Sequence, residues 1–75
     1  MKQIIIYTTA KCKYCKRAKK FLDENKIRYV EKDINKDKTA KEEHSKLNVK
    51  GVPVFIIGNE VIWGFDEEKL LEFIK

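Results

Sequence analysis

Two cysteines separated by two residues are the groups in this sequence best suited to chemistry. Cys12 and Cys15 are the only cysteines among the 75 residues. A bridge between them would close a loop too short to staple a fold. In a cytosolic chain such a pair is typical of a redox-active dithiol or of half a metal site, rather than of a structural disulfide. The spacing therefore predicts either thiol–disulfide exchange or metal binding at these two residues.

A metal site built within one chain is disfavoured by the ligands available. A structural zinc site normally takes four ligands, and His44 is the only histidine in the sequence. We expect His44 to be a packed surface histidine on a helix remote from Cys12. Redox chemistry is therefore the favoured interpretation, and no metal is expected.

The residues on either side of the pair predict different surroundings for the two thiols. Residues 4–7 form an apolar run typical of a strand covered on both faces. Cys12 then falls at or just before the first turn of a helix, where free backbone N–H groups and the helix dipole favour a thiolate. Cys15 lies one turn later on the apolar face, with Ala18, Phe21 and Leu22, and is expected to be a buried, protonated thiol. This asymmetry suits an attacking thiol at Cys12 and a resolving thiol at Cys15.

The positive charge of the chain is concentrated around the cysteines. The net charge is +5, yet residues 1–20 hold seven lysines or arginines and no acid, among them Lys11, Lys13, Lys16 and Arg17. This is either a solvated helix face or a field that stabilises a thiolate and attracts anionic partners. No nucleic-acid partner is expected, because these basic residues lack interleaved, exposed aromatic residues that stack on bases.

The rest of the pattern predicts a single domain over residues 1–75. The expected elements are a strand at 4–7, a helix fading near 25–26, a polar edge strand at 28–32, a second helix, a hairpin of 54–57 and 60–63 around Gly58-Asn59, and a last helix. The first two strands enclose a helical crossover and should be parallel, whereas the hairpin must be antiparallel. We therefore expect an α/β fold with a four-stranded mixed sheet and helices on both faces.

Polar residues predict where the second and third helices begin. Asn35 or Asp37 is a candidate cap for the second helix, and Thr39 to Glu42 has the form of a capping box. That helix is weakly amphipathic through Ala40, His44 and Leu47. Asp66 is expected to cap the last helix, whose apolar residues are Leu70, Leu71 and Ile74.

No segment of the sequence predicts export or membrane insertion. The apolar stretch at the beginning of the chain is too short for a signal peptide and runs directly into Thr8 and Thr9. No apolar run approaches the length of a bilayer span. We therefore expect a cytoplasmic protein with no membrane partner.

Three motifs, in order along essentially the whole chain, resemble the glutaredoxin family. They are Ile5-Ile6-Tyr7-Thr8 leading into Cys12-Lys13-Tyr14-Cys15, then Gly51-Val52-Pro53, then Gly64-Phe65-Asp66. The resemblance implies a thioredoxin fold, thiol–disulfide oxidoreductase activity and glutathione as co-substrate. Expected partners are disulfide-containing or glutathionylated proteins, acted on by a monomer.

The same resemblance implies the residues that bind glutathione and substrate. It implies a cis peptide bond between Val52 and Pro53, which would expose the Val52 backbone to a substrate strand. Phe65 and Asp66 would receive the γ-glutamyl end of glutathione through backbone N–H groups and the Asp66 carboxylate. Lys11, Lys13 and Tyr14, beside the cysteines, complete the predicted binding set.

Three departures from the family pattern leave the electron donor open. Thr9 stands where the family often has a basic residue, a role that Lys11 or Lys13 could take instead. Lys13 stands where the family usually has proline, and Trp63 stands where it has the first of two glycines. An aromatic residue there is similar to redoxins that serve ribonucleotide reductase and take electrons from thioredoxin reductase. That reductase is therefore an alternative donor to glutathione. A second alternative is a carrier of a glutathione-ligated [2Fe–2S] cluster shared by two chains.

Overall fold

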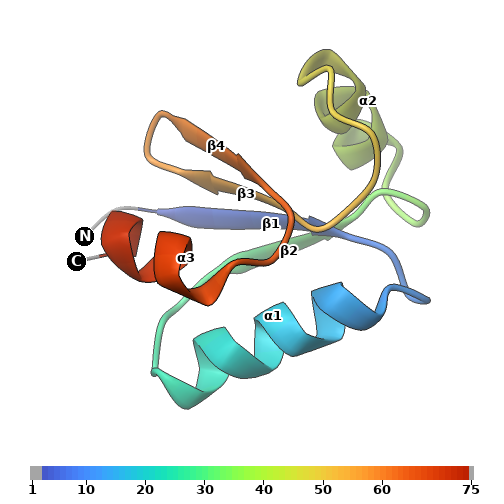
Figure 1. The fold of residues 1–75 in the computed structure, drawn as a ribbon. Helices are drawn as coiled ribbons and strands as arrows, with labels where there is room; N and C mark the ends of the chain where they lie inside the picture. The colour runs from blue at the N-terminus through green and yellow to red at the C-terminus, as the bar shows by residue number, and fades with distance from the viewer. Residues whose placement is uncertain (1–2, 75) are drawn as a thin grey trace.

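The computed structural model describes residues 3–74, except the side chain of Ile74, and arranges them in the predicted order of elements (Figure 1). The elements are β1 (Ile4–Thr8), α1 (Lys13–Glu24), β2 (Val30–Asp33), α2 (Lys38–Lys46), β3 (Val54–Ile57), β4 (Glu60–Trp63) and α3 (Glu67–Ile74). The fold is α/β, as expected. None of the helices within these residues has the length and apolar character needed to cross a bilayer.

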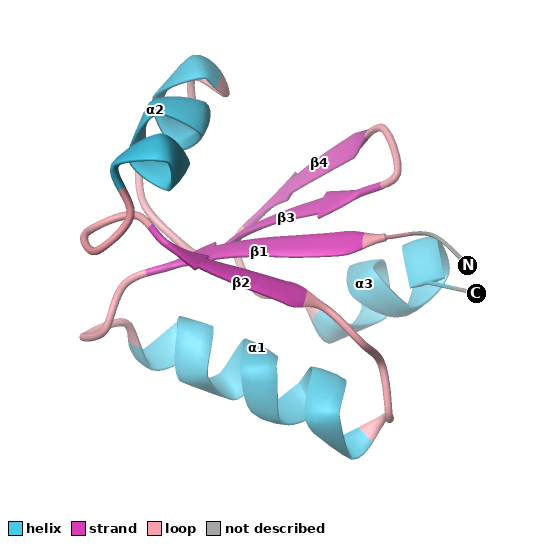
Figure 2. Cartoon of the chain, turned by 180° about the vertical axis from the view of Figure 1, so that it is seen from behind, coloured by secondary structure: helices cyan, strands magenta, loops and turns pink. Residues whose placement is uncertain are grey.

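The strands form a mixed four-stranded sheet in the order β2-β1-β3-β4. β1 and β2 are parallel, with Ile5 opposite Val30, whereas β3 pairs antiparallel with both β1 and β4. The predicted parallel pair, hairpin and edge position of the polar strand are therefore confirmed. The two mainly apolar strands, β1 and β3, occupy the centre of the sheet (Figure 2).

Helices cover both faces of this sheet, with α1 and α3 on one side and α2 on the other (Figure 1). Ile6 and Phe55 point toward the first side and pack with Leu22 of α1 and Leu70 of α3, all fully buried. Tyr7 and Val54 point the opposite way and pack with Ala40 of α2. Successive residues of the central strands enter different cores, which is why residues 4–7 and 54–57 are all apolar.

The polar edge strand differs from its prediction by two residues at its start. β2 begins at Val30 rather than at residue 28, and it extends to Asp33, opposite Thr8. The preceding Tyr29 packs against the α1 side of the core from the connection. The limits of β2 are thus set by its register with β1, which polar residues do not reveal.

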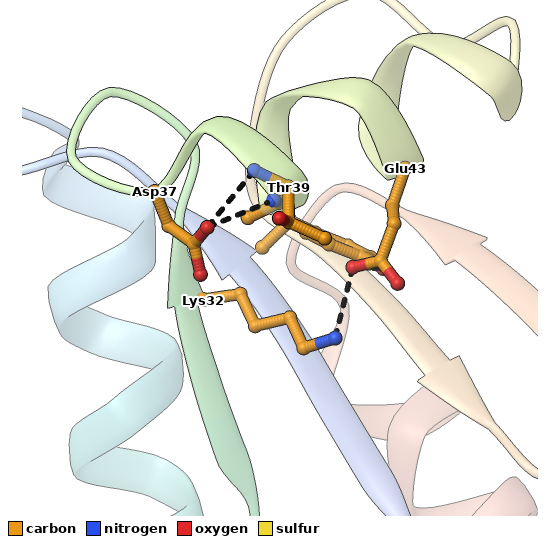
Figure 3. A network of polar contacts seen from close by, with 6 residues as sticks. Lys32, Asp37, Thr39 and Glu43 are labelled. Carbon is orange, nitrogen blue, oxygen red and sulfur yellow. Dashed lines mark hydrogen bonds and ion pairs between the residues drawn. The ribbon is translucent and has the colours of Figure 1, made fainter.

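α2 begins after Asp37, which decides between the two candidate caps. The Asp37 carboxylate accepts hydrogen bonds from the backbone N–H groups of Thr39, at 2.9 Å, and Ala40, at 3.3 Å (Figure 3). The predicted capping box from Thr39 to Glu42 is wrong, because Thr39 already lies inside the helix. Lys32 of β2 pairs with Glu43 at 2.8 Å and ties this helix to the sheet.

α3 begins as predicted. The Asp66 carboxylate accepts a hydrogen bond from the Lys69 N–H at 3.2 Å, and the Asp66 carbonyl accepts from Leu70 at 3.0 Å. Leu70 is buried and Leu71 is half-buried, whereas the expected role of Ile74 concerns a side chain outside the described residues.

Candidate active site

Cys12 is the N-cap of α1. Its backbone is extended, with φ −87° and ψ 115°, and its Sγ accepts a hydrogen bond from the Cys15 N–H at 3.2 Å. A sulfur therefore occupies the place that an Asp or Ser oxygen usually takes at a helix start. An N–H donor and the positive end of the helix dipole both stabilise negative charge on this atom.

The second motif lies against the same sulfur. The Cys12 thiol donates to the Val52 carbonyl oxygen at 3.7 Å. The peptide bond between Val52 and Pro53 is cis, as the family resemblance implied. The Gly64 N–H donates to the Pro53 carbonyl at 2.9 Å, so the first residue of the third motif is bonded to the second motif. The Cys12 side chain and the Gly64 backbone thus connect the three motifs through hydrogen bonds to the loop around Pro53.

Cys15 lies in contrasting surroundings. Its side chain is fully buried, and both cysteines are free thiols. The pKa of the Cys15 thiol is raised to about 12, chiefly by burial and then by the hydrogen bond with Cys12, against smaller opposite effects from the Thr9 backbone and Lys19. The expected buried, protonated second thiol is therefore present.

Basic side chains surround the exposed side of Cys12. Lys11, Lys13 and Tyr14 are exposed, and the Arg17 guanidinium lies 5.7 Å from the centre of the Tyr14 ring. The first turn of α1 holds no acidic residue. The ion pairs within residues 3–74 are Lys19–Glu31 and Lys32–Glu43, so no carboxylate in that range forms an ion pair with Lys11 or Lys13.

In the third motif, one side chain is packed in the core and another is exposed to solvent. The Phe65 ring packs edge-on against Phe21, with ring centres 5.9 Å apart, so its side chain serves the core. Asp66 is exposed at the start of α3. Trp63 is 58% exposed and lies opposite Val54, the residue after Pro53. An indole therefore stands on the strand beside the cis-proline loop.

His44 was not anticipated at this site. It is buried rather than on the surface, and its Nε2 donates to the Gly51 carbonyl oxygen at 2.8 Å. Its ring also meets Tyr7 edge-on, at 6.1 Å between ring centres. The histidine thus holds the residue that precedes Val52. The available signal was its spacing from Ala40 and Leu47, which places it on the inner face of α2.

A polar group near Cys15 was also missed by sequence reasoning. Thr8 is buried and its hydroxyl donates to Glu31 at 2.8 Å, while Lys19 pairs with the same carboxylate at 2.9 Å. The Lys19 ammonium is the main cause of the lowered pKa of Glu31. This group borders an open depression of about 390 Å³, lined by Thr9, Ala10, Lys16, Lys19, Glu31, Asp33 and Lys36. The signal for Lys19 was its position one helical turn after Cys15.

The part of the chain that the structure describes contains no cluster of three or more His, Cys, Asp or Glu side chains arranged to hold a metal ion.

Comparison with known proteins shows the family to which this chain belongs. A family model described as Glutaredoxin matches residues 4–62. The chain belongs to the glutaredoxin family. It is 33% identical over 73 residues to an uncharacterized glutaredoxin-like 8.6 kDa protein in the rubredoxin operon of Clostridium pasteurianum, covering 96% of this chain and 97% of that one.

The glutaredoxin-family chain is also similar to solved structures. It is similar to the glutaredoxin of Archaeoglobus fulgidus, with a TM-score of 0.84 and 28% identity, covering 100% of this chain and 88% of the other. NrdH-redoxin of Escherichia coli shares the fold, with a TM-score of 0.85, 21% identity, and coverage of 93% and 92%. The fold is thus the thioredoxin fold that the resemblance implied. The family match ends before Phe65 and Asp66, whose ligand-binding roles remain predictions.

Proposed function

We propose that this glutaredoxin-family chain is a thiol–disulfide oxidoreductase that reduces protein disulfides or glutathione mixed disulfides. The observation that carries the proposal is the 3.2 Å hydrogen bond from the Cys15 N–H to the Cys12 sulfur at the helix start. It gives one half-buried sulfur a stabilised charged form, while the other sulfur is buried one helical turn away. Such a pair is suited to accept and then release a substrate sulfur.

In the first step the Cys12 thiolate attacks one sulfur of the substrate disulfide. The Cys12–substrate bond forms, the substrate S–S bond breaks, and the second substrate sulfur leaves as a thiolate that takes a proton from water. The Val52 backbone, whose carbonyl lies 3.7 Å from Cys12 Sγ, is placed to pair with an extended substrate segment.

In the second step Cys15 loses its proton and attacks the Cys12 sulfur. The mixed disulfide breaks, the substrate leaves reduced, and the two electrons come from the dithiol, which becomes a Cys12–Cys15 disulfide. Glutathione is the proposed reductant, either by resolving the mixed disulfide before Cys15 does or by reducing the internal disulfide. We propose that Lys11, Lys13 and Tyr14 bind it beside Cys12, and that Phe65 and Asp66 bind its γ-glutamyl end.

Trp63 supports a second candidate, a redoxin reduced by a thioredoxin-reductase-type flavoprotein and donating electrons to ribonucleotide reductase. Its side chain is 58% exposed on the strand next to Pro53. A bulky indole at that position competes for space with a glutathione held along the loop. This candidate keeps the same roles for Cys12 and Cys15 and changes only the source of electrons.

The test is reduction of a small glutathione mixed disulfide by glutathione, coupled to glutathione reductase. Cys12→Ser should abolish turnover, whereas Cys15→Ser should keep any route in which glutathione resolves the intermediate. Turnover in Cys12→Ser would contradict the assignment of the nucleophile. A wild-type chain that fails here but is reduced by thioredoxin reductase would favour the second candidate, and Trp63→Gly should then gain glutathione-dependent turnover.

A further inference from the structure

One face of α1 carries four exposed cations that begin next to Cys12. We name Lys13, Lys16, Arg17 and Lys20 the basic stripe; all four are exposed, and their spacing places them on one side of the helix. The opposite side of α1 carries the buried Cys15, Ala18 and Leu22. Because the buried side packs on the sheet, the stripe faces away from it. Figure 2 shows α1 lying along one face of the sheet.

The charged residues of α1 are not placed where they would interact favourably with the helix dipole. A helix favours acidic residues in its first turn and basic residues in its last turn, and α1 has neither. By contrast, α3 has Glu67 and Glu68 in its first turn, and α2 has His44 and Lys46 in its last turn. The like charges of the stripe also lie three and four residues apart, where they repel one another. Helix stability therefore does not account for this arrangement.

The basic stripe also has no ion-pair partner among the described residues. Neither ion pair within residues 3–74 involves any of its four members. Arg17 instead lies over the ring of Tyr14, which is 57% exposed beside Cys12. The surface next to the attacking sulfur thus offers an aromatic ring and several free cations.

We propose that the basic stripe binds an acidic segment of the disulfide-bearing protein that Cys12 attacks. The inference rests on the proposed function and names its substrate class. Seven residues of helix rise, from Lys13 to Lys20, cover about 10 Å, which an extended segment of three residues matches. The acidic residues of the partner therefore lie within three or four residues of its reactive cysteine.

The test compares three peptide disulfides that differ only in the three residues beside the cysteine: aspartates, glutamines or lysines. The second-order rate constant for their reduction by the reduced chain is measured by rapid quenching. At low ionic strength the aspartate peptide should react at least about tenfold faster than the lysine peptide. The difference should shrink toward onefold in about 1 M salt, because the screening length falls to about 3 Å.

A matched pair of variants separates the stripe from net charge. Arg17→Gln/Lys20→Gln should lower the rate with the aspartate peptide several-fold and leave the rate with an uncharged disulfide, hydroxyethyl disulfide, unchanged. Lys41→Gln/Lys46→Gln removes the same charge from exposed positions of α2 and should leave both rates unchanged. Equal effects of the two double variants would overturn the proposal.

The remaining outcomes are also decisive. Equal rates for all three peptides, with hydroxyethyl disulfide reduced normally, would refute the acidic partner and leave the proposed function intact. No reduction of any disulfide would refute the proposed function itself. Tight, stripe-dependent binding of a single-stranded oligonucleotide, with no advantage for the aspartate peptide, would replace the acidic protein by nucleic acid.

Discussion

Four consecutive residues place one sulfur at a helix end and another in the core. Cys12 needs an extended backbone to cap α1, whereas Cys15 belongs to the helical face that packs on the sheet. The first sulfur receives a backbone N–H donor from Cys15 itself, at 3.2 Å. The spacing of the two cysteines therefore determines both their proximity and their difference in burial.

The raised pKa of Cys15 predicts how the second step depends on pH. Burial, the largest cause of the pKa of about 12, persists when Cys12 is held in a mixed disulfide, so the pKa of Cys15 stays raised. The thiolate fraction of Cys15, and hence the rate of internal disulfide formation, should rise about tenfold per pH unit through the neutral and mildly alkaline range. With an aromatic disulfide that releases a coloured thiol, the second release should show this slope.

The control for that measurement is Cys15→Ser, which should show the first release of coloured thiol without the second. A plateau in the second release near pH 8 would contradict the prediction, because it would mean that Cys15 ionises at or below the ordinary pKa of a thiol.

His44 allows a second prediction at a single residue. His44→Phe keeps a ring against Tyr7 but removes the Nε2 donor to the Gly51 carbonyl. The free energy of unfolding should fall by about 1 kcal/mol, the usual net value of one hydrogen bond. In a domain of this size the melting temperature should drop by roughly 4–8 °C. Calorimetry with the exposed Ser45→Ala as control checks this; equal melting temperatures for the two variants would show that the bond contributes nothing.

At the scale of helices, strands and turns, the sequence predicted the structure best where neighbouring residues alone determine it. The β3–β4 hairpin follows from two apolar runs around Gly58-Asn59, and Gly58 has φ +61°, which suits glycine. Cys12 at the start of α1 was predictable for the same reason. The central strands were predictable because both faces are buried, which requires continuous apolar residues.

Features that depend on tertiary register were not predictable. The limits of β2 follow from pairing with β1, and its polar residues carry no periodic signal for them. The burial of His44 depends on how α2 lies across the sheet, beside the loop that holds Gly51. The link from Thr8 through Glu31 to Lys19 joins β1, β2 and α1, which only the assembled fold brings together.

The cap of α2 provides a prediction at this scale. Asp37→Ala removes the carboxylate that accepts from Thr39 and Ala40, and it should lower the free energy of unfolding by about 1 kcal/mol. Asn35→Ala changes the other candidate cap and should alter stability by less than about 0.5 kcal/mol. Urea denaturation of both variants checks this. A larger loss for Asn35→Ala than for Asp37→Ala would contradict the assigned cap.

At the scale of the whole molecule, two hydrophobic cores lie on opposite faces of a single sheet. With 75 residues the chain sits near the size at which a single core just suffices. Its cysteine pair spans one helical turn, so it adds little constraint between distant elements. Stability must come from residues such as Ile6 and Phe55, which connect the central strands to α1 and α3.

Phe55 provides the prediction that tests this dependence. It is fully buried in the middle of β3, and Phe55→Ala should cost about 3–5 kcal/mol. A domain of 75 residues has a total of roughly 4–11 kcal/mol, so this one change should remove a large part of it. Val61→Ala, on a side chain that is 47% exposed, should cost less than about 1 kcal/mol. Urea denaturation followed by circular dichroism measures both losses. If both variants unfold at the same urea concentration, stability does not depend on the core between β3 and α1. If Phe55→Ala alone is largely unfolded without urea, the fold depends on the packing around β3. That packing then also holds Cys12, Val52 and Gly64 together.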